Sequence, residues 1–456
     1  MKKNTHSTAR LLWDSKENVD ITEVAPIIEV ERVFPNPIID CNQISFLSVE
    51  TSAHSKSDIS NRMIQGDNLQ IMQTLLEEGY EGLINLIYVD PPYFSDADYR
   101  STIHLKNGDS QESVERQAFK DTWKQGIDSY LDMLYPRLKL MKKLLTDNGS
   151  IFVHLDWHVS GYIKLLLDEI FSMDKMVNEI IWCYGGGSGA KRHFHRKHDT
   201  IFWYAKGDNY VFNPQYRPYT PGTLERGLTR VKGDKYNLHC EGALMQDWWP
   251  DINKILSPTA GENLKFPTQK PAALLHRIIS TASKPGDLIA DFFAGTGTTA
   301  SVCTKLERKW IICDNSNLAI QTSKYRLTTT SLPFKVQKID NNLKEEQDTN
   351  KLELLTPVIE KYDDYSVLVR IGIKYYSSTA KTKNSLTDFS SYIEYWAVDL
   401  GYNGVFQSDY QIFRENRFKG NISLSIVAKL PRQENYCIAV KVYDVFAQSA
   451  VRVIEF

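Results

Sequence analysis

The sequence predicts an α/β fold in which helices flank a parallel sheet, followed by a small C-terminal β-sandwich-like domain. Residues 62–89 give the first indication, because a short apolar run, a stripe with helical spacing and a second apolar run follow one another. The run over residues 83–89 is almost continuously apolar, which is typical of a strand covered on both faces. From residue 361 onward, short strand-like segments replace the helical patterns.

The chain divides into four parts: an N-terminal arm (1–60), a main α/β domain (61–340), a charged linker (341–360) and a C-terminal β domain (361–456). Its 456 residues are 42% hydrophobic and 24% charged, as in ordinary globular proteins. No apolar run approaches the roughly 20 residues that span a bilayer. The net charge of -2 gives no overall nucleic-acid signal, so any basic surface must be local. The six cysteines form no Cys-x-x-Cys pair, which favours reduced thiols in a cytosolic protein.

Along the main domain, residues 94–127 are polar with little periodicity, and a connection of this length is usually a functional or mobile loop. Apolar stripes and runs predict the other elements. The expected helices cover 69–78, 128–146, 162–171, a segment opened by Pro271, and 319–327, and the expected strands cover 150–155, 179–184, 200–204, 288–293 and 310–313. The strands 179–184 and 200–204 could form an antiparallel pair.

The strand 83–89 runs into Asp90-Pro91-Pro92-Tyr93. Neither proline can donate to a sheet ladder, so strand pairing must stop there. Ligands bind at the carboxyl ends of the strands in an open parallel sheet. The motif therefore places an acid, two rigid carbonyls and an aromatic ring where a ligand is expected.

A second motif, Gly295 to Ala300, follows a strand and opens a helix, and Asp314 ends the next strand. Glycines let the backbone approach a ligand, and a helix N-terminus favours negative groups. Taken alone, this pattern fits the dinucleotide fingerprint of a nicotinamide dehydrogenase. Nothing in the sequence supplies a hydride-transfer acid–base pair, however, and another nucleoside ligand, S-adenosylmethionine, is the alternative.

Three motifs taken together, at residues 90–93, 266–271 and 291–299, resemble the DNA amino-methyltransferases of bacterial restriction-modification systems. Their order resembles the β class. The segments 154–158 and 197–201 are similar to the modification subunits of type III systems. The resemblance covers about residues 61–330.

It implies a Rossmann-like methyltransferase sheet, S-adenosylmethionine as cofactor, and a site-specific, adenine-specific DNA-methyltransferase. The enzyme would be cytoplasmic, and associated with the bacterial nucleoid through DNA.

The catalytic residues implied by the resemblance are Asp90, Pro91, Pro92 and Tyr93. Asp90 and the Pro91 carbonyl would accept hydrogen bonds from the exocyclic amine, and Tyr93 would stack on a base flipped out of the duplex. In the family, Asp at the first position usually accompanies adenine and Ser accompanies cytosine N4, so cytosine-N4 methylation remains the alternative. No Pro-Cys motif is present for C5-cytosine chemistry.

The resemblance also implies a set of donor-binding residues. Glycines would form the turn, Asp291 and Phe293 would line the methionine and adenine parts, and Asp314 would hold the ribose, where many relatives have Glu. Asp67 would approach the adenine amine, and Thr268 and Lys270 the methionine carboxylate. The full set is Asp67, Thr268, Lys270, Asp291, Phe293, Gly295, Gly297, Thr298 and Asp314. For Asp67 and Thr268, turn or cap chemistry is an equal alternative.

A DNA-facing surface is expected between residues 185 and 240, where ten Lys or Arg and four Asp or Glu give a local charge of +6. Its DNA-binding candidates are Lys191, Arg192, Arg196, Lys197, Arg226 and Arg230. The target-recognition region is expected at 208–265, with a solvated loop as the alternative. His193, His195 and His198 could bind a metal, but no carboxylate or cysteine completes a convincing site.

The expected partner is double-stranded DNA. The resemblance adds a homodimer and a separate restriction or helicase subunit, because the chain has no Gly-x-x-x-x-Gly-Lys-Ser/Thr loop. A catalytically idle DNA-binding assembly subunit is the alternative from another class. The segment Tyr436 to Asp444 is similar to PKD-type immunoglobulin-like modules, whose role here could be dimerisation, partner docking or DNA clamping.

Overall fold

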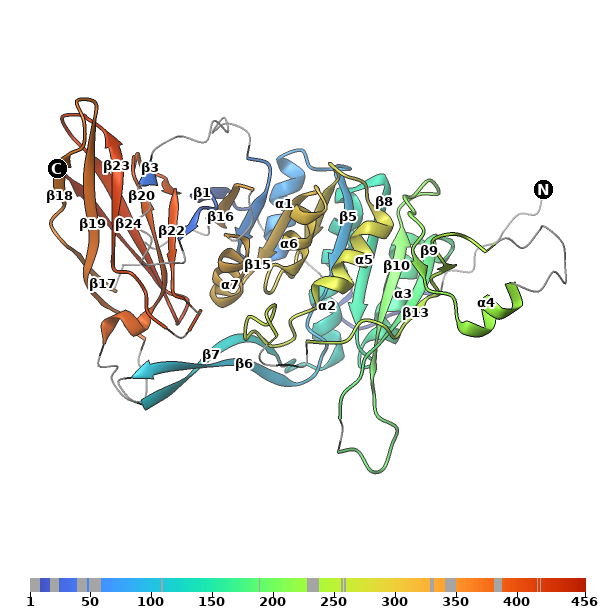
Figure 1. The fold of residues 1–456 in the computed structure, drawn as a ribbon. Helices are drawn as coiled ribbons and strands as arrows, with labels where there is room; N and C mark the ends of the chain where they lie inside the picture. The colour runs from blue at the N-terminus through green and yellow to red at the C-terminus, as the bar shows by residue number, and fades with distance from the viewer. Residues whose placement is uncertain are drawn as a thin grey trace.

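The computed structural model describes residues 9–16, 24–38, 47–48, 59–107, 110–187, 189–227, 238–255, 257, 260–328, 332–340, 350–380, 388–415, 417–418 and 420–456. Figure 1 shows an α/β domain beside a β-sandwich, with a long hairpin running beneath both. The predicted α/β fold with a C-terminal β domain is confirmed. Among the described helices, none is long and apolar enough to cross a membrane.

The central sheet has the order β13-β9-β10-β8-β5-β14-β15-β4-β16-β1-β21. Neighbouring strands from β8 to β16 run parallel. They are β8 (Leu145–Leu155), β5 (Ile84–Val89), β14 (Leu288–Asp291), β15 (Lys309–Asp314), β4 (Arg62–Gln65) and β16 (Phe334–Ile339). β10 (His198–Ala205) pairs antiparallel with β9 (Met176–Cys183), as expected for these two segments, and it also pairs antiparallel with β8. The edges are β13 (Trp248–Trp249), β1 (Ile27–Val33) and β21 (Phe406–Ser408).

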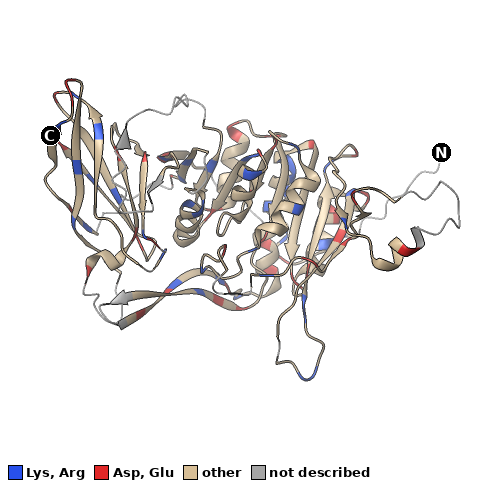
Figure 2. Ribbon diagram, viewed as in Figure 1, with Lys and Arg blue, Asp and Glu red and all other residues tan. Residues whose placement is uncertain are grey.

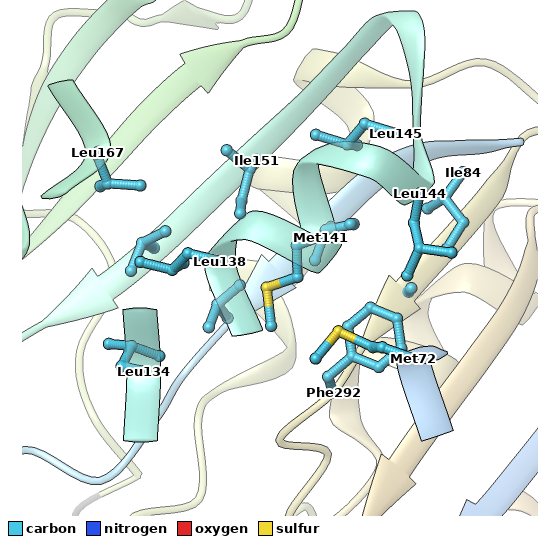
Figure 3. Close-up of a cluster of buried hydrophobic side chains, with 14 of the residues drawn as sticks. Met72, Ile84, Leu134, Leu138, Met141, Leu144, Leu145, Ile151, Leu167 and Phe292 are labelled. Atoms are coloured by element: carbon cyan, nitrogen blue, oxygen red, sulfur yellow. The ribbon is translucent and has the colours of Figure 1, made fainter. Parts of the chain in front are cut away.

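Helices cover both faces of this sheet, which explains why its central strands are almost entirely apolar. One face packs against α1 (Asn68–Glu77), α2 (Ile127–Leu144) and α3 (Ser160–Phe171), and the other against α5 (Ala272–Ala282), α6 (Thr298–Lys305) and α7 (Asn317–Leu327). Figure 3 shows part of the core on the first face, where Leu134, Leu138 and Met141 of α2 gather with Ile151 of β8 in one buried cluster. Helical spacing of these residues therefore produces the buried stripe.

Residues 94–127 were expected to be a loop, and this expectation is wrong. They contain a hairpin of β6 (Ala97–Asn107) and β7 (Ser110–Asp121). Burial alternates along it, but Ser101 and Arg116 occupy buried positions beside Ile103 and Val114, so the apolar pattern is interrupted. The hairpin packs on Val445 of the C-terminal domain, a contact that local sequence cannot reveal.

The C-terminal domain is a sandwich of two sheets around a core containing Val369, Ile371, Trp396 and Val440. One sheet contains β17 (Lys351–Leu354), β18 (Val358–Lys361), β19 (Ser366–Ser377), β23 (Ser425–Pro431) and β3 (Leu47–Ser48). The other contains β2 (Pro37–Ile38), β22 (Tyr410–Phe413), β20 (Ile393–Asp399), β24 (Cys437–Asp444) and β25 (Ser449–Glu455).

This arrangement changes two expectations about the chain's organisation. β17 and β18 belong to the sandwich, so the second half of the expected linker 341–360 is part of a sheet. The N-terminal arm supplies β1 to the central sheet, and β2 and β3 to the two sandwich sheets. The arm therefore ties the two domains together.

Short elements complete the described fold. β11 (Tyr216–Arg217) pairs with β12 (Ala243–Leu244), and α4 (Pro221–Gly227) follows β11 in the expected target-recognition region. Two 3₁₀ turns, Met173–Lys175 and Phe389–Tyr392, lie at the ends of other elements.

Candidate active site

Asp90 follows β5 directly, and β5 lies between β8 and β14 in the middle of the sheet. The carboxyl ends of these parallel strands open onto a cavity of about 840 Å³. It is lined by every predicted catalytic and donor-binding residue except Gly297: Asp67, Asp90, Pro91, Pro92, Tyr93, Thr268, Lys270, Asp291, Phe293, Gly295, Thr298 and Asp314. The sheet order thus brings together three motifs that are far apart in sequence.

The Asp90 carboxylate is held by two neighbours. Lys270 Nζ donates to Oδ1 at 2.8 Å and to Oδ2 at 2.6 Å, and the Tyr93 hydroxyl donates to Oδ1. Burial and the neighbouring Asp90 raise the pKa of Tyr93 well above its usual value, so its phenol remains a donor. Lys270 was expected at a methionine carboxylate, but here its ammonium group pairs with the Asp90 carboxylate.

The glycine turn is shaped by backbone geometry. Gly295 has φ of +52° and Gly297 of +66°, a region that favours glycine. Asp314 Oδ2 accepts from the Gly295 amide at 2.9 Å, and Asp314 Oδ1 accepts from the Ser316 amide at 2.9 Å. Burial raises the pKa of Asp314 to about 6.

Asp291, at the end of β14, accepts from the Thr299 hydroxyl at 2.5 Å and from the Phe293 amide at 3.0 Å. Burial raises the pKa of this carboxyl to about 7. Two carboxyl groups that end neighbouring strands therefore fix the turn between them.

Gly297→Ala is expected to lower the free energy of unfolding by about 2 kcal/mol, because positive φ strains an L-residue. A Cβ at this position would also lie 2.9 Å from Ser323 Cβ. Urea denaturation measures the change. Gly161→Ala is the matched control: its Cβ meets nothing within 4 Å, and alanine within α3 should stabilise by about 0.5 kcal/mol. Equal stability of the two variants would contradict the prediction.

Asp67 and Thr268 have the helix-cap and turn roles that were the alternative to donor binding. Asp67 caps α1 by accepting from the Leu69 amide at 2.7 Å, and it pairs with Arg137 at 2.9 Å. The Thr268 backbone has φ of +62°, and its carbonyl accepts from Lys270 Nζ at 3.4 Å. Both residues also line the larger cavity, so these roles are compatible with contact to a molecule bound there.

A second cavity of about 490 Å³ adjoins the first and shares with it Tyr93, Tyr99 and the segment 266–270. Its other walls include Asp156, Trp157, Tyr184, Arg196, Asp199 and Lys254. The Arg196 guanidinium lies 4.0 Å from the centre of the Trp157 ring. Tyr93 therefore lines both cavities.

Beneath Tyr93 lies a buried polar chain that sequence analysis missed. Tyr88 OH and His154 Nδ1 are 2.8 Å apart, His154 Nε2 and Asp199 Oδ2 are 3.2 Å apart, and Tyr184 donates to Asp199 Oδ1 at 2.7 Å. Burial, with Lys270 nearby, lowers the pKa of His154. Although burial opposes it, the His154 contact holds the pKa of Asp199 below its usual value. Polar residues within apolar strands β8 and β10 are the signal that could have found this chain.

The predicted DNA-binding residues fall into separate places. Lys191, Arg192, Arg196 and Lys197 lie on the long loop between β9 and β10 that projects from the domain (Figure 2). Phe194 on this loop is 97% exposed. Arg226 lies in α4, a different segment, and Arg230 is outside the described residues. Among the described residues, no three His, Cys, Asp or Glu side chains gather to hold a metal ion.

The chain is similar in sequence to known DNA methyltransferases. A family model described as DNA methylase matches residues 84–324. The type II methyltransferase M.EcaI of Enterobacter cloacae is 26% identical, over 60% of this chain and 71% of its own length. The StyLTI Mod subunit of a type III restriction-modification enzyme from Salmonella typhimurium is 25% identical, over 58% of this chain, which spans 53% of that protein.

DNA adenine methyltransferase YhdJ of Escherichia coli is 26% identical over 59% of this chain and 83% of its own length. Among solved structures, the M1.HpyAVI–SAM complex is 21% identical over 58% of this chain and 98% of that chain, with a TM-score of 0.38.

Proposed function

The chain belongs to the N6/N4 DNA methylase family, whose model matches residues 84–324, and we propose that it transfers a methyl group from S-adenosylmethionine to the N6 amine of adenine in double-stranded DNA. The observation that carries the proposal is the pair of adjoining cavities separated by Tyr93. One cavity contains the glycine turn and Asp314, and the other opens beside the cationic loop. Asp90 lines the first cavity, and its hydrogen-bond partners Tyr93 and Lys270 line both.

The larger cavity fits a nucleoside methyl donor. Gly295 and Gly297 hold the turn in left-handed backbone, and the helix α6 begins at Thr298 directly after it, where a helix N-terminus favours negative groups. Asp314 ends β15 beside this turn, where a ribose hydroxyl could donate to it. When bound, S-adenosylmethionine supplies a methyl group on a positively charged sulfur, which keeps the electron pair as the methyl moves to nitrogen.

The chain's own residues prepare the amine. Adenine's exocyclic nitrogen is a poor nucleophile because its lone pair is delocalised into the ring. Within the described part of the chain, Asp90 Oδ2 accepts from Lys270 alone, so it retains a lone pair for an amine N–H, and the Pro91 carbonyl is the second acceptor. These acceptors favour a pyramidal nitrogen directed at the methyl carbon, while Lys270 holds the carboxylate in place. The methylated nitrogen then carries a positive charge and passes one proton to the Asp90 carboxylate, its hydrogen-bond acceptor, which releases the proton to water.

The smaller cavity would receive the base once it leaves the duplex. Tyr93 would stack on the base, and Arg196 with Lys191, Arg192 and Lys197 would contact phosphates near the opening. The target-recognition region at 208–265 adjoins this opening through Lys254 and Ile255. The chain keeps Asp90 together with the two side chains that hold its carboxylate, Lys270 and Tyr93. This argues against a catalytically idle assembly subunit.

Sequencing methylated bases in host DNA tests the proposal. We expect N6-methyladenine at one short site in cells carrying the wild-type chain, and none in cells carrying Asp90→Ala. N4-methylcytosine instead would favour the cytosine-N4 alternative, and it would leave the amine-methylating chemistry intact. Calorimetry with S-adenosylmethionine and NAD provides the cofactor control: binding of NAD alone would contradict the proposal.

We propose two kinds of partner in addition to DNA. Because one relative is named a Mod subunit, a separate restriction or helicase subunit is proposed as a partner, along with a homodimer in the cytoplasm. Purification from the host, followed by light scattering, measures both the mass of the assembly and any copurified subunit.

A further inference from the structure

The backbone that follows the catalytic motif is held in an unusual conformation. Phe94 has φ of +62° and Asp96 of +53°, although neither residue is glycine. Left-handed backbone at a non-glycine residue is strained and persists only when surrounding contacts determine it. The loop that carries Tyr93 must therefore be held from outside.

Asp121 supplies those contacts. Its Oδ2 accepts from the Tyr93 amide at 3.1 Å and the Ser95 amide at 2.8 Å, and its Oδ1 accepts from the Phe94 amide at 3.0 Å. The Ser95 hydroxyl donates to Oδ2 at 2.7 Å, and the Trp123 indole N–H donates to Oδ1 at 2.8 Å. The Asp121 side chain is fully buried.

This carboxylate has no counter-ion among the residues that the structure describes. Its charge is met by five N–H and O–H donors, three of which are consecutive backbone amides of the catalytic loop. Hydrogen bonds to a buried charged group are stronger than those between neutral groups. The carboxylate can accept all three amides only if the loop keeps its observed curvature.

Asp121 is the last residue of β7, and the same strand is anchored on the C-terminal domain. Arg116 Nη1 donates to the Val445 carbonyl at 3.1 Å, Nη2 donates to Ser101 Oγ at 2.9 Å, and the guanidinium lies 4.9 Å from the centre of the Phe418 ring. Phe446, next to Val445, lines the larger cavity. β7 therefore connects the turn after β24 to the catalytic loop (Figure 1).

We propose that Asp121 is a positioning residue that fixes the backbone of Tyr93 to Ser95, and through it the aim of Asp90 and Tyr93. The C-terminal domain holds this clamp in place through Arg116. The activity part of this inference rests on the proposed methyl transfer, whereas the backbone part does not.

The test uses the full-length chain and Asp121→Asn, which keeps the size of the side chain but turns one acceptor oxygen into a donor that faces N–H groups. Hydrogen–deuterium exchange of the peptide containing residues 93–95 should become at least about tenfold faster. kcat should fall at least about tenfold, with the KM for the methyl donor changed less than about twofold. Asp98→Asn, on the exposed side of the same hairpin, is the matched control and should change neither.

Two milder variants keep the inference testable if Asp121→Asn does not fold. Ser95→Ala and Trp123→Phe each remove one donor while leaving the carboxylate, and each should accelerate exchange at 93–95 and lower kcat by about threefold. Arg116→Met removes the hydrogen bond to the Val445 carbonyl, and it should also accelerate exchange at 93–95 and lower kcat.

Unchanged exchange at 93–95 in Asp121→Asn would overturn the clamp. A loss confined to KM would overturn the positioning role and assign Asp121 to donor binding. If wild-type protein transfers no methyl group yet Asp121→Asn exchanges faster at 93–95, the clamp stands and the proposed function fails.

Discussion

Replacing Asp90 with alanine is expected to lower kcat for methyl transfer by about 10³-fold, at the upper end of what the loss of one preorganised group causes. The carboxylate lines the larger cavity beside Tyr93, where it would accept an amine N–H while Lys270 and Tyr93 fix its orientation. Single-turnover transfer of a labelled methyl group to DNA measures the effect. The dissociation constant for S-adenosylmethionine, measured by calorimetry, should change by less than about threefold, because the glycine turn at 295–297 is untouched.

Asp90→Ala also leaves the Lys270 ammonium buried without its partner, and this side effect needs its own control. Lys270 is only 8% exposed, so an unpaired charge there could disturb the site by itself. The double variant Asp90→Ala/Lys270→Met removes both charges. We expect it to stay as slow as the single variant. Recovery of activity in the double variant would show that the stranded lysine, and not the loss of Asp90, caused the defect.

Glu31→Gln is expected to lower the free energy of unfolding by about 3 kcal/mol, because it breaks a buried charge cluster. Glu31 on β1 is 1% exposed, and it accepts from Lys324 of α7 at 2.8 Å, Lys441 of β24 at 2.9 Å and Tyr443 at 2.7 Å. The cluster joins the arm, the α/β domain and the sandwich. Urea denaturation at pH 7 measures the loss.

The pH dependence of stability gives a second measurement of the same cluster. Although burial alone would raise it, the two lysines lower the pKa of Glu31 to about 2, from 4.5. Because the folded value lies below the unfolded one, this stabilisation is complete above pH 4.5 and is lost as the pH falls toward 2. Wild-type protein should therefore lose stability over this interval more steeply than Glu31→Gln.

Burial of Lys324 offsets part of the stabilisation that the ionised Glu31 contributes. Burial outweighs its attraction to Glu31 and lowers the pKa of Lys324 to about 8, from 10.5. Its unfolded form binds more protons between these values, so stability should rise as the pH rises from 8 to 10.5. Glu31 remains the centre of the cluster, because it accepts from three donors and carries the net stabilisation below pH 8.

Glu29→Gln is the matched control on the same strand. Glu29 pairs with Arg32 near the surface, where such pairs contribute less than about 1 kcal/mol. An equal loss of stability in the two variants would contradict a special role for the buried cluster.

Much of the main domain could be read from local patterns. The buried strand 83–89, the proline stop after it and the glycine turn at 295–297 each depend on neighbours within a few residues. The hairpin at 97–121 could not be read in this way, because Ser101 and Arg116 are buried by contacts with each other and with Val445. Polar residues in buried positions hide the period of two that marks a strand.

By itself, the sequence determined the α/β class, the three motifs and their order, because each is a short run whose residue types dictate a backbone conformation. Only the tertiary structure decided which side chains meet Asp90, Asp121 and Glu31. Lys270 lies 180 positions from Asp90, and Tyr443 lies 412 positions from Glu31. Such partners are chosen by the order of strands in the sheet and by the docking of the two domains, and a buried carboxylate must find its donors wherever the fold places them.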